Sequence, residues 1–228
     1  MIFVKSEDLK YGMRLAKPIY NKTGVLLYER NTRLTLQGIE SVKNFGLLGL
    51  YILEPAEPVP PMTEEDLDFE RFQTMAVFSI REELDNIIAG REPVNLKRLA
   101  NAIITNYGRL DHKITFTQNL RSTTDYVYKH VINTAILCAL ISAQVYYTPT
   151  EQEELVLAAL LHDIGKLLLP NKVREKYDDY DTNDLIIVKK IQNDGLGLLR
   201  PEIGIDSGVR RIVAQIHMET VIWNRARF

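Results

Sequence analysis

The chain has 228 residues, enough for one or two domains with a sizeable core, and its 46% hydrophobic and 25% charged residues are ordinary for a globular protein. The formal net charge of −2 gives no basic surplus, so we expect no nucleic-acid partner and no membrane partner. We find no signal peptide and no run of about 18 uncharged apolar residues, and therefore predict a cytoplasmic protein. The single cysteine, Cys138, lies in an apolar run and is predicted to be a core residue.

Residues 1–54 are predicted to form a small α+β module. Short β-prone runs cover residues 2–4, 15–20, 25–28 and 50–53. The second and third runs flank the turn signal 21–24, which reads NKTG and favours a hairpin. Thr35 can cap a helix that ends near residue 45, before Gly46.

The next segment, residues 55–61, is predicted to be a stiff linker. It contains four prolines, which fix φ and remove backbone donors. Residues 62–228 then show helical periodicity, with helices predicted over 62–90, 95–107, 126–147, 182–199 and 207–222. Capping boxes are predicted at 122–125 and at 150–153, the second opening a helix that carries residues 155–161. The fold is therefore predicted to be mainly α, a helical bundle after a small α+β domain.

The segment most informative about chemistry is 160–166, which reads LLHDIGK. Imidazole nitrogens and carboxylate oxygens both bind divalent metals, and an aspartate can bridge two ions, so His162 and Asp163 are candidate ligands. Adjacent positions on a helix point about 100° apart, so both reach one ion only if it lies between their directions. Gly165 would allow a tight turn, and Lys166 would place a cation beside a bound phosphate. Such a pair also occurs at solvated helix ends and does not identify a site alone.

A histidine early in the preceding predicted helix, His130, changes this interpretation. The strings DYVYKHVINTA at 125–135 and AALLHDIGK at 158–166 closely resemble the HD-GYP family, part of the HD superfamily of metal-dependent phosphohydrolases. The resemblance covers residues 122–219, and the N-terminal module resembles a small domain that often precedes HD-GYP domains. It implies a helical HD-type bundle that holds metal ions and hydrolyses cyclic di-GMP.

Five positions are assigned roles by this resemblance. His130, His162 and Asp163 match metal ligands, with Asp163 as the bridging, catalytic carboxylate. Lys166 matches the catalytic lysine that contacts the phosphate of the substrate. His217 matches the first histidine of a His-His-Glu string and is a further candidate ligand.

Other positions depart from the family pattern. Ile191 and Met218 stand where the family has histidines, and neither side chain is a good ligand for a hard divalent ion. The sequence contains no Asp-Gly-x-Gly-Tyr-Pro loop and no later helix with a further aspartate, so the domain resembles one truncated at its C-terminal end. We therefore expect one ion (Fe, Mn, Mg or similar) rather than two, or none if the domain is a pseudo-enzyme.

Three hypotheses about function follow from these residues. The first is an HD-GYP-like protein with impaired or lost hydrolase activity and a signalling role through an unknown protein partner or as a homodimer. The second is an active metal-dependent phosphodiesterase with a mononuclear site, acting on cyclic di-GMP or another phosphoester. The third is a fragment whose gene continues with the missing loop and aspartate.

Overall fold

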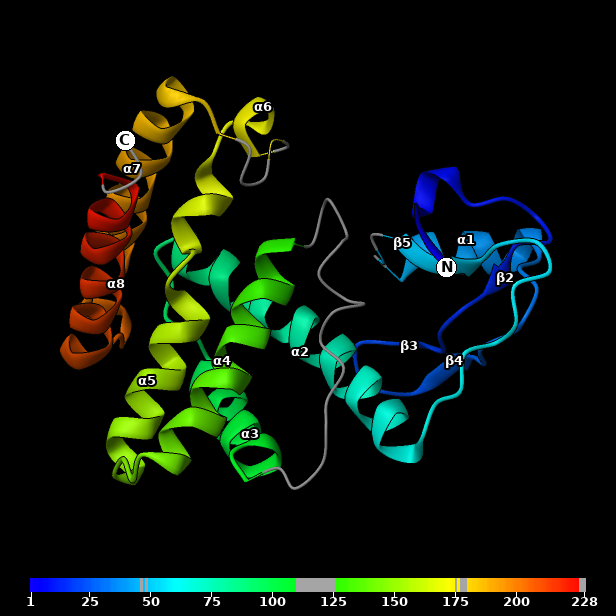
Figure 1. Ribbon diagram of the computed structural model, residues 1–228, viewed down its shortest axis with the longest axis horizontal. Helices are drawn as coiled ribbons and strands as arrows, with labels where there is room; N and C mark the ends of the chain where they lie inside the picture. The colour runs from blue at the N-terminus through cyan, green and yellow to red at the C-terminus, as the bar shows by residue number, and fades with distance from the viewer. Residues whose placement is uncertain (46, 48, 110–125, 175, 177–179, 226–228) are drawn as a thin grey trace. The chain divides into compact units, whose positions relative to one another are not determined.

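The computed structural model is shown in Figure 1. It describes residues 1–45, 47, 49–109, 126–174, 176 and 180–225, with side chains up to residue 217. The described residues pack as two compact units, one that contains residues 1–78 and one that contains residues 79–109 and those from 127 onward. This division falls inside helix α2 (Glu64–Ile88), after the proline segment at 55–61. Packing does not test where an independently folding domain begins, so the predicted boundary stays a prediction.

The first unit contains two small antiparallel sheets and one helix. Strands β1 (Ile2–Lys5), β5 (Gly49–Leu53) and β2 (Arg14–Leu15) form one sheet in the order β1-β5-β2. Strands β3 (Ile19–Tyr20) and β4 (Leu26–Tyr28) pair as the predicted hairpin. Helix α1 (Leu36–Asn44) begins where predicted, because Thr35 Oγ1 accepts a hydrogen bond from the Gly38 amide at 3.0 Å.

The core of this first unit joins side chains from both sheets and from α1. It is formed by eight buried residues: Leu9, Leu15, Ile19, Leu34, Ile39, Val42, Leu50 and Ile52. The 3-10 helix η1 (Ser6–Asp8) connects β1 to this core. The predicted α+β module therefore has a hydrophobic core of its own.

The second unit is helical, which confirms the mainly α prediction. After the second half of α2 it contains α3 (Leu96–Tyr107), α4 (Tyr126–Gln144), α5 (Pro149–Leu161), η2 (Ile164–Leu168), α6 (Asn171–Arg174), α7 (Thr182–Leu198), η3 (Pro201–Ile203) and α8 (Ser207–Arg225). Helix α6 was not predicted from the sequence, because four residues are too few to show a helical period. Helix α8 extends to Arg225, beyond its predicted end at 222.

The capping box predicted at Thr150 is wrong by two residues. Thr148 is the N-cap of α5, and its hydroxyl accepts from the Glu151 amide while Glu151 Oε2 accepts from the Thr148 amide. Pro149 occupies the first helical position, where its missing amide proton costs nothing. The box predicted at 122–125 lies outside the described residues. Asp181 is the N-cap of α7, and its carboxylate accepts hydrogen bonds from the amides of Asn183 and Asp184.

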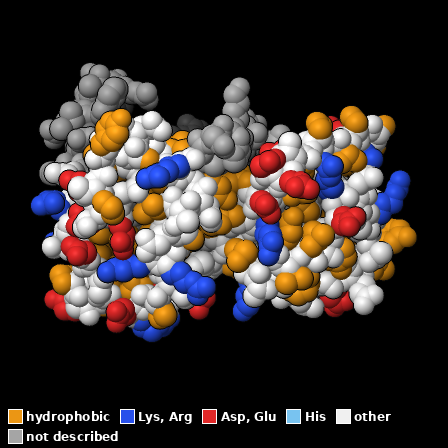
Figure 2. Space-filling model, turned by 90° about the horizontal axis from the view of Figure 1, so that it is seen from below, with side chains coloured by type: hydrophobic (Ala, Val, Ile, Leu, Met, Phe, Trp, Pro, Cys, Tyr) orange, Lys and Arg blue, Asp and Glu red, His pale blue; other side chains and the backbone are white. Residues whose placement is uncertain are grey.

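Helix α4 is the most apolar of the described helices. By length and composition it could span a membrane, although a large part of its surface is buried inside the structure. A buried core helix has the same length and composition, so this is weak evidence for a membrane segment. Figure 2 shows acidic and basic side chains interspersed over the face drawn, in keeping with the small net charge.

Helix α7 packs directly on the backbone of η2, through two glycines. A Cβ atom on Gly165 would lie 2.7 Å from the Ile191 carbonyl oxygen and 2.8 Å from the Gln192 Cα. A Cβ on Gly195 would lie 2.6 Å from the Gly165 Cα. Gly165 was expected to allow a tight turn, but it is not among the glycines with positive φ. Glycine is instead needed at this position because the backbones of η2 and α7 approach each other closely there.

A substitution of Gly195 tests this contact. Gly195→Ala is expected to destabilise the protein by about 1–3 kcal/mol, because the backbone of Gly165 cannot move away as a flexible side chain could. The matched control is Gly197→Ala in the same helix, where nothing lies within 4 Å of the added atom. That variant should gain up to about 1 kcal/mol from helix propensity. Urea denaturation measures both changes, and equal effects would contradict the close packing.

Candidate metal centre

Helix α4 presents His130 from its second turn. The neighbours Val131 and Ile132 are fully buried, which fixes the rotation of the helix about its axis. The Arg81 guanidinium of α2 lies 5.2 Å from the centre of the Tyr128 ring and holds the first turn of α4 by a cation–π contact. The His130 side chain is 31% exposed, so this helix forms the solvent-facing side of the site.

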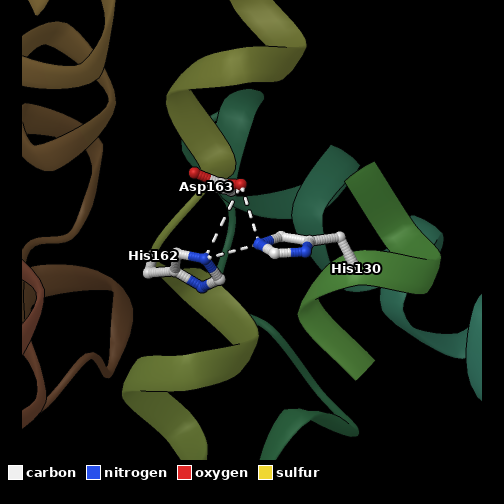
Figure 3. A group of neighbouring side chains, drawn as sticks. All are labelled: His130, His162 and Asp163. Atoms are coloured by element: carbon white, nitrogen blue, oxygen red, sulfur yellow. Dashed lines mark hydrogen bonds and ion pairs between the residues drawn. The ribbon is translucent and has the colours of Figure 1, made fainter. Parts of the chain in front are cut away.

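Helix α5 ends inside the second unit and supplies the other two residues. Residues 156–161 are all buried, so the hydrophobic packing of α5 carries its C-terminal end into the interior. His162 is the C-cap residue that follows α5, and Asp163 precedes the 3-10 helix η2. The backbone leaves α-helical geometry at Asp163, with φ −106° and ψ 15°. Because of this change the two adjacent side chains point toward one place, as Figure 3 shows.

Three potential ligand atoms converge there, from α4 and from the α5–η2 junction (Figure 3). The Nε2 atoms of His130 and His162 are 3.2 Å apart. Asp163 Oδ2 lies 3.5 Å from the first and 3.6 Å from the second. Ligand atoms at three corners of a tetrahedron around an ion, with bonds of about 2.1 Å, are about 3.4 Å apart. The spacing of the three atoms therefore fits one divalent ion.

The ring of His162 is oriented for this purpose by the helix that carries it. Its Nδ1 lies 2.7 Å from the Ala159 carbonyl oxygen, one turn earlier in α5. A carbonyl can only accept, so Nδ1 carries the proton and donates it. In the neutral ring Nε2 then carries the lone pair, and that is the atom that faces His130 and Asp163. The hydrogen bond thus selects the tautomer that can bind a cation.

Lys166 contacts the same carboxylate. Side chains three residues apart lie on one side of a 3-10 helix, and Lys166 Nζ is 2.8 Å from Asp163 Oδ2. Burial alone would raise the pKa of Asp163, but its electrostatic interactions with His162, Lys166 and His130 outweigh the effect of burial and hold that pKa below its ordinary value. The carboxylate is therefore ionised at neutral pH, which is the form that binds metal.

The other predicted positions lie differently. His217 on α8 is buried, and its Nε2 is 2.7 Å from the backbone oxygen of His162. It is not in the described group of three residues whose ligand atoms lie within 4.8 Å of one another. Ile191 packs against an apolar cluster of Leu169, Val173 and Val188. The side chain of residue 218 lies outside the described part.

Two backbone carbonyls at this centre were not found from the sequence. The Ala159 oxygen accepts a hydrogen bond from His162 Nδ1, and the His162 oxygen accepts one from His217 Nε2. The first could have been inferred, because a residue that ends a helix can reach the carbonyl three positions earlier. The second joins residues 55 positions apart and leaves no local pattern in the sequence.

Comparison with known proteins supports one part of the chain as an HD domain. A family model described as the HD domain matches residues 127–207, which contain His130, His162, Asp163 and Lys166. The match supports the HD superfamily for this segment, whose domains bind divalent metals and are typical of metal-dependent phosphohydrolases. Comparison of the chain with curated proteins and with solved structures gives no match.

The ion pair of Lys166 leads to a prediction about pH. Lys166→Met removes a cation from a carboxylate that is 4% exposed, so the pKa of Asp163 should rise and the free energy of unfolding at pH 7 should fall by about 3 kcal/mol. A carboxyl with a lowered folded-state pKa contributes stability above its unfolded value of about 3.9 and loses it as pH falls through the folded value. The difference between the two proteins should therefore shrink below about pH 4.

Carbon-13 NMR of the Asp163 carboxyl group and urea denaturation at several pH values measure these two effects. The control is Lys172→Met, at an exposed lysine of α6, which should change stability by less than about 0.5 kcal/mol. A Lys166 variant with the stability of this control at every pH would refute the electrostatic role.

Proposed function

We propose that the second unit is an HD-type domain that binds one divalent metal ion through His130, His162 and Asp163, and that acts on a phosphoester with hydrolysis weakened by the lack of a second ion. The observation that carries this proposal is the spacing of 3.2–3.6 Å among two Nε2 atoms and one carboxylate oxygen. A divalent ion held there would activate water and neutralise charge on a phosphate. Two imidazoles and one carboxylate favour a transition-metal ion such as Fe or Mn over Mg.

The environment of Ile191 supports one ion rather than two. In the HD-GYP pattern this position on α7 carries a histidine. Here the side chain joins an apolar cluster and offers no donor atom. A second ion near Asp163 would keep too few protein ligands to be held with its charge compensated. We therefore infer an HD-GYP-like domain with a mononuclear centre.

Lys166 is the residue we assign to the substrate. Its ammonium pairs with Asp163 Oδ2, the oxygen that also faces both imidazoles. A dication bound to this oxygen would repel the ammonium, and the flexible lysine chain could then turn to an anionic oxygen of a phosphoester. Among phosphoesters, the resemblance of 125–135 and 158–166 to HD-GYP domains favours a cyclic dinucleotide such as cyclic di-GMP.

A second candidate function is signalling without hydrolysis. Its support is the same apolar packing of Ile191, which offers no metal ligand at this position. A site with fewer metal ligands can still bind a phosphoester without hydrolysing it. The domain would then bind its phosphoester or a protein partner and transmit that state. The two candidates differ in one measurable quantity, which is metal-dependent hydrolysis.

Metal content is the first test. After reconstitution with Mn²⁺ or Fe²⁺ the full chain should contain about one ion per molecule by elemental analysis, as expected for a mononuclear site. His162→Ala and Asp163→Asn should each weaken binding by at least about 100-fold in calorimetric titrations, since even outer partners of a site contribute 10–100-fold. Asp194→Asn, at an exposed position of α7, is the matched control and should bind as the natural chain does. Absence of bound metal in the natural chain would end the proposal.

Hydrolysis is the second test. The metal-loaded chain should cleave bis(p-nitrophenyl) phosphate or cyclic di-GMP slowly, and the His162→Ala, Asp163→Ala double variant should not. Equal rates for the two proteins, with metal bound in the natural chain, would exclude catalysis and leave the signalling candidate. Lys166→Met should weaken substrate binding while its metal affinity is kept or increased, because the competing ammonium is gone.

A further inference from the structure

His217 contacts the candidate metal centre through the backbone of His162, whereas the resemblance in sequence suggests a metal ligand at this position. Its Nε2 lies 2.7 Å from the backbone oxygen of His162, and the exposed fraction of His217 is only 7%. The oxygen cannot donate, so His217 Nε2 must carry a proton and donate it. A nitrogen that carries a proton has no lone pair for an ion. The contact therefore argues against ligation through Nε2.

The accepting carbonyl belongs to the end of a buried helix. The last carbonyls of an α-helix have no partner within the helix, and a buried one must find a partner elsewhere. The next carbonyl, that of Asp163, accepts from the Lys166 amide within η2 at 2.9 Å. For His162 that partner is supplied by α8, 55 residues later in the chain. His217 thus fixes the peptide that joins the two ligands His162 and Asp163.

From these contacts we infer that His217 is a positioning residue, and that it holds the His162–Asp163 peptide so that both side chains face one ion. This inference rests on the proposed metal site. His162 is then held at two points, because its ring donates to Ala159 and its backbone accepts from His217. The remaining nitrogen of His217, Nδ1, is buried and has no hydrogen-bond partner within the described part of the structure. A lone pair there is consistent with a proton on Nε2.

A pair of amide variants separates positioning from ligation. Glutamine can place its amide nitrogen near the position of imidazole Nε2 and can donate to the His162 carbonyl. Asparagine has a similar amide but ends one carbon shorter. We expect His217→Asn to raise the dissociation constant for Mn²⁺ about 10–100-fold, as loss of an outer partner does, and His217→Gln to restore most of this loss. Equal losses in both variants would overturn the inference, since an imidazole ligand is replaced by neither amide.

The same variants also exclude a purely structural role. Thermal unfolding establishes the temperature range in which all three proteins are folded, and metal titrations are made within it. If His217→Asn lowers the melting temperature but leaves the dissociation constant at the natural value, His217 supports the fold alone and the inference fails.

A metal-free measurement keeps this inference separate from the proposed function. Nitrogen-15 labelling of the chain's 4 histidines, followed by long-range proton–nitrogen NMR, reports which ring nitrogen carries the proton. We expect the proton of His217 on Nε2 both before and after addition of Mn²⁺ or its diamagnetic substitute Zn²⁺. A lone pair on Nε2 would overturn the inference even if metal binds. A chain that shows the expected tautomer but binds no metal would overturn the proposed function alone.

Discussion

The negative charge of one buried carboxylate, that of Asp163, must be compensated, and this requirement determines which residues surround it in the second unit. Asp163 is carried to the interior by α5, whose last six residues are buried, and an isolated charge there would be strongly unfavourable. Lys166 supplies a cation from the next turn, and two imidazoles face the same oxygen from α4 and α5. The packing that buries α5 thus makes the charge of Asp163 unfavourable by itself, and the polar residues around the end of α5 offset this cost.

The backbone at this point is held from several directions. Helix α7 lies against η2 at a distance that only glycine permits at residues 165 and 195. Helix α8 reaches the end of α5 through the imidazole of His217. The first turn of α4 is held against α2 by Arg81 and Tyr128. Such a frame keeps the two imidazole nitrogens and the carboxylate oxygen at a spacing that could hold one ion, and preorganisation of this kind limits the cost of assembling a site.

The sequence alone predicted much of this arrangement, and its failures have physical causes. Long periodic helices such as α2 were predictable, since a helical period leaves a clear pattern. The grouping of His130 with His162 and Asp163 was predicted from the resemblance of two sequence strings to a known family, because the His-Asp pair alone does not identify a site. The capping box of α5 was placed at Thr150, because the pattern occurs twice and only the fold selects Thr148. The role of Gly165 and the contact of His217 depend on residues distant in the chain, and no local pattern records such contacts.

The packing of Ile191 also bears on how this domain can change over generations. The side chain of Ile191 packs against the apolar cluster of Leu169, Val173 and Val188. A histidine at this position would bring a polar ring against that cluster and would require changes in its neighbours. The effect of such a substitution therefore depends on the surrounding side chains, so a further ligand cannot be introduced on this helix by one substitution without loss of stability.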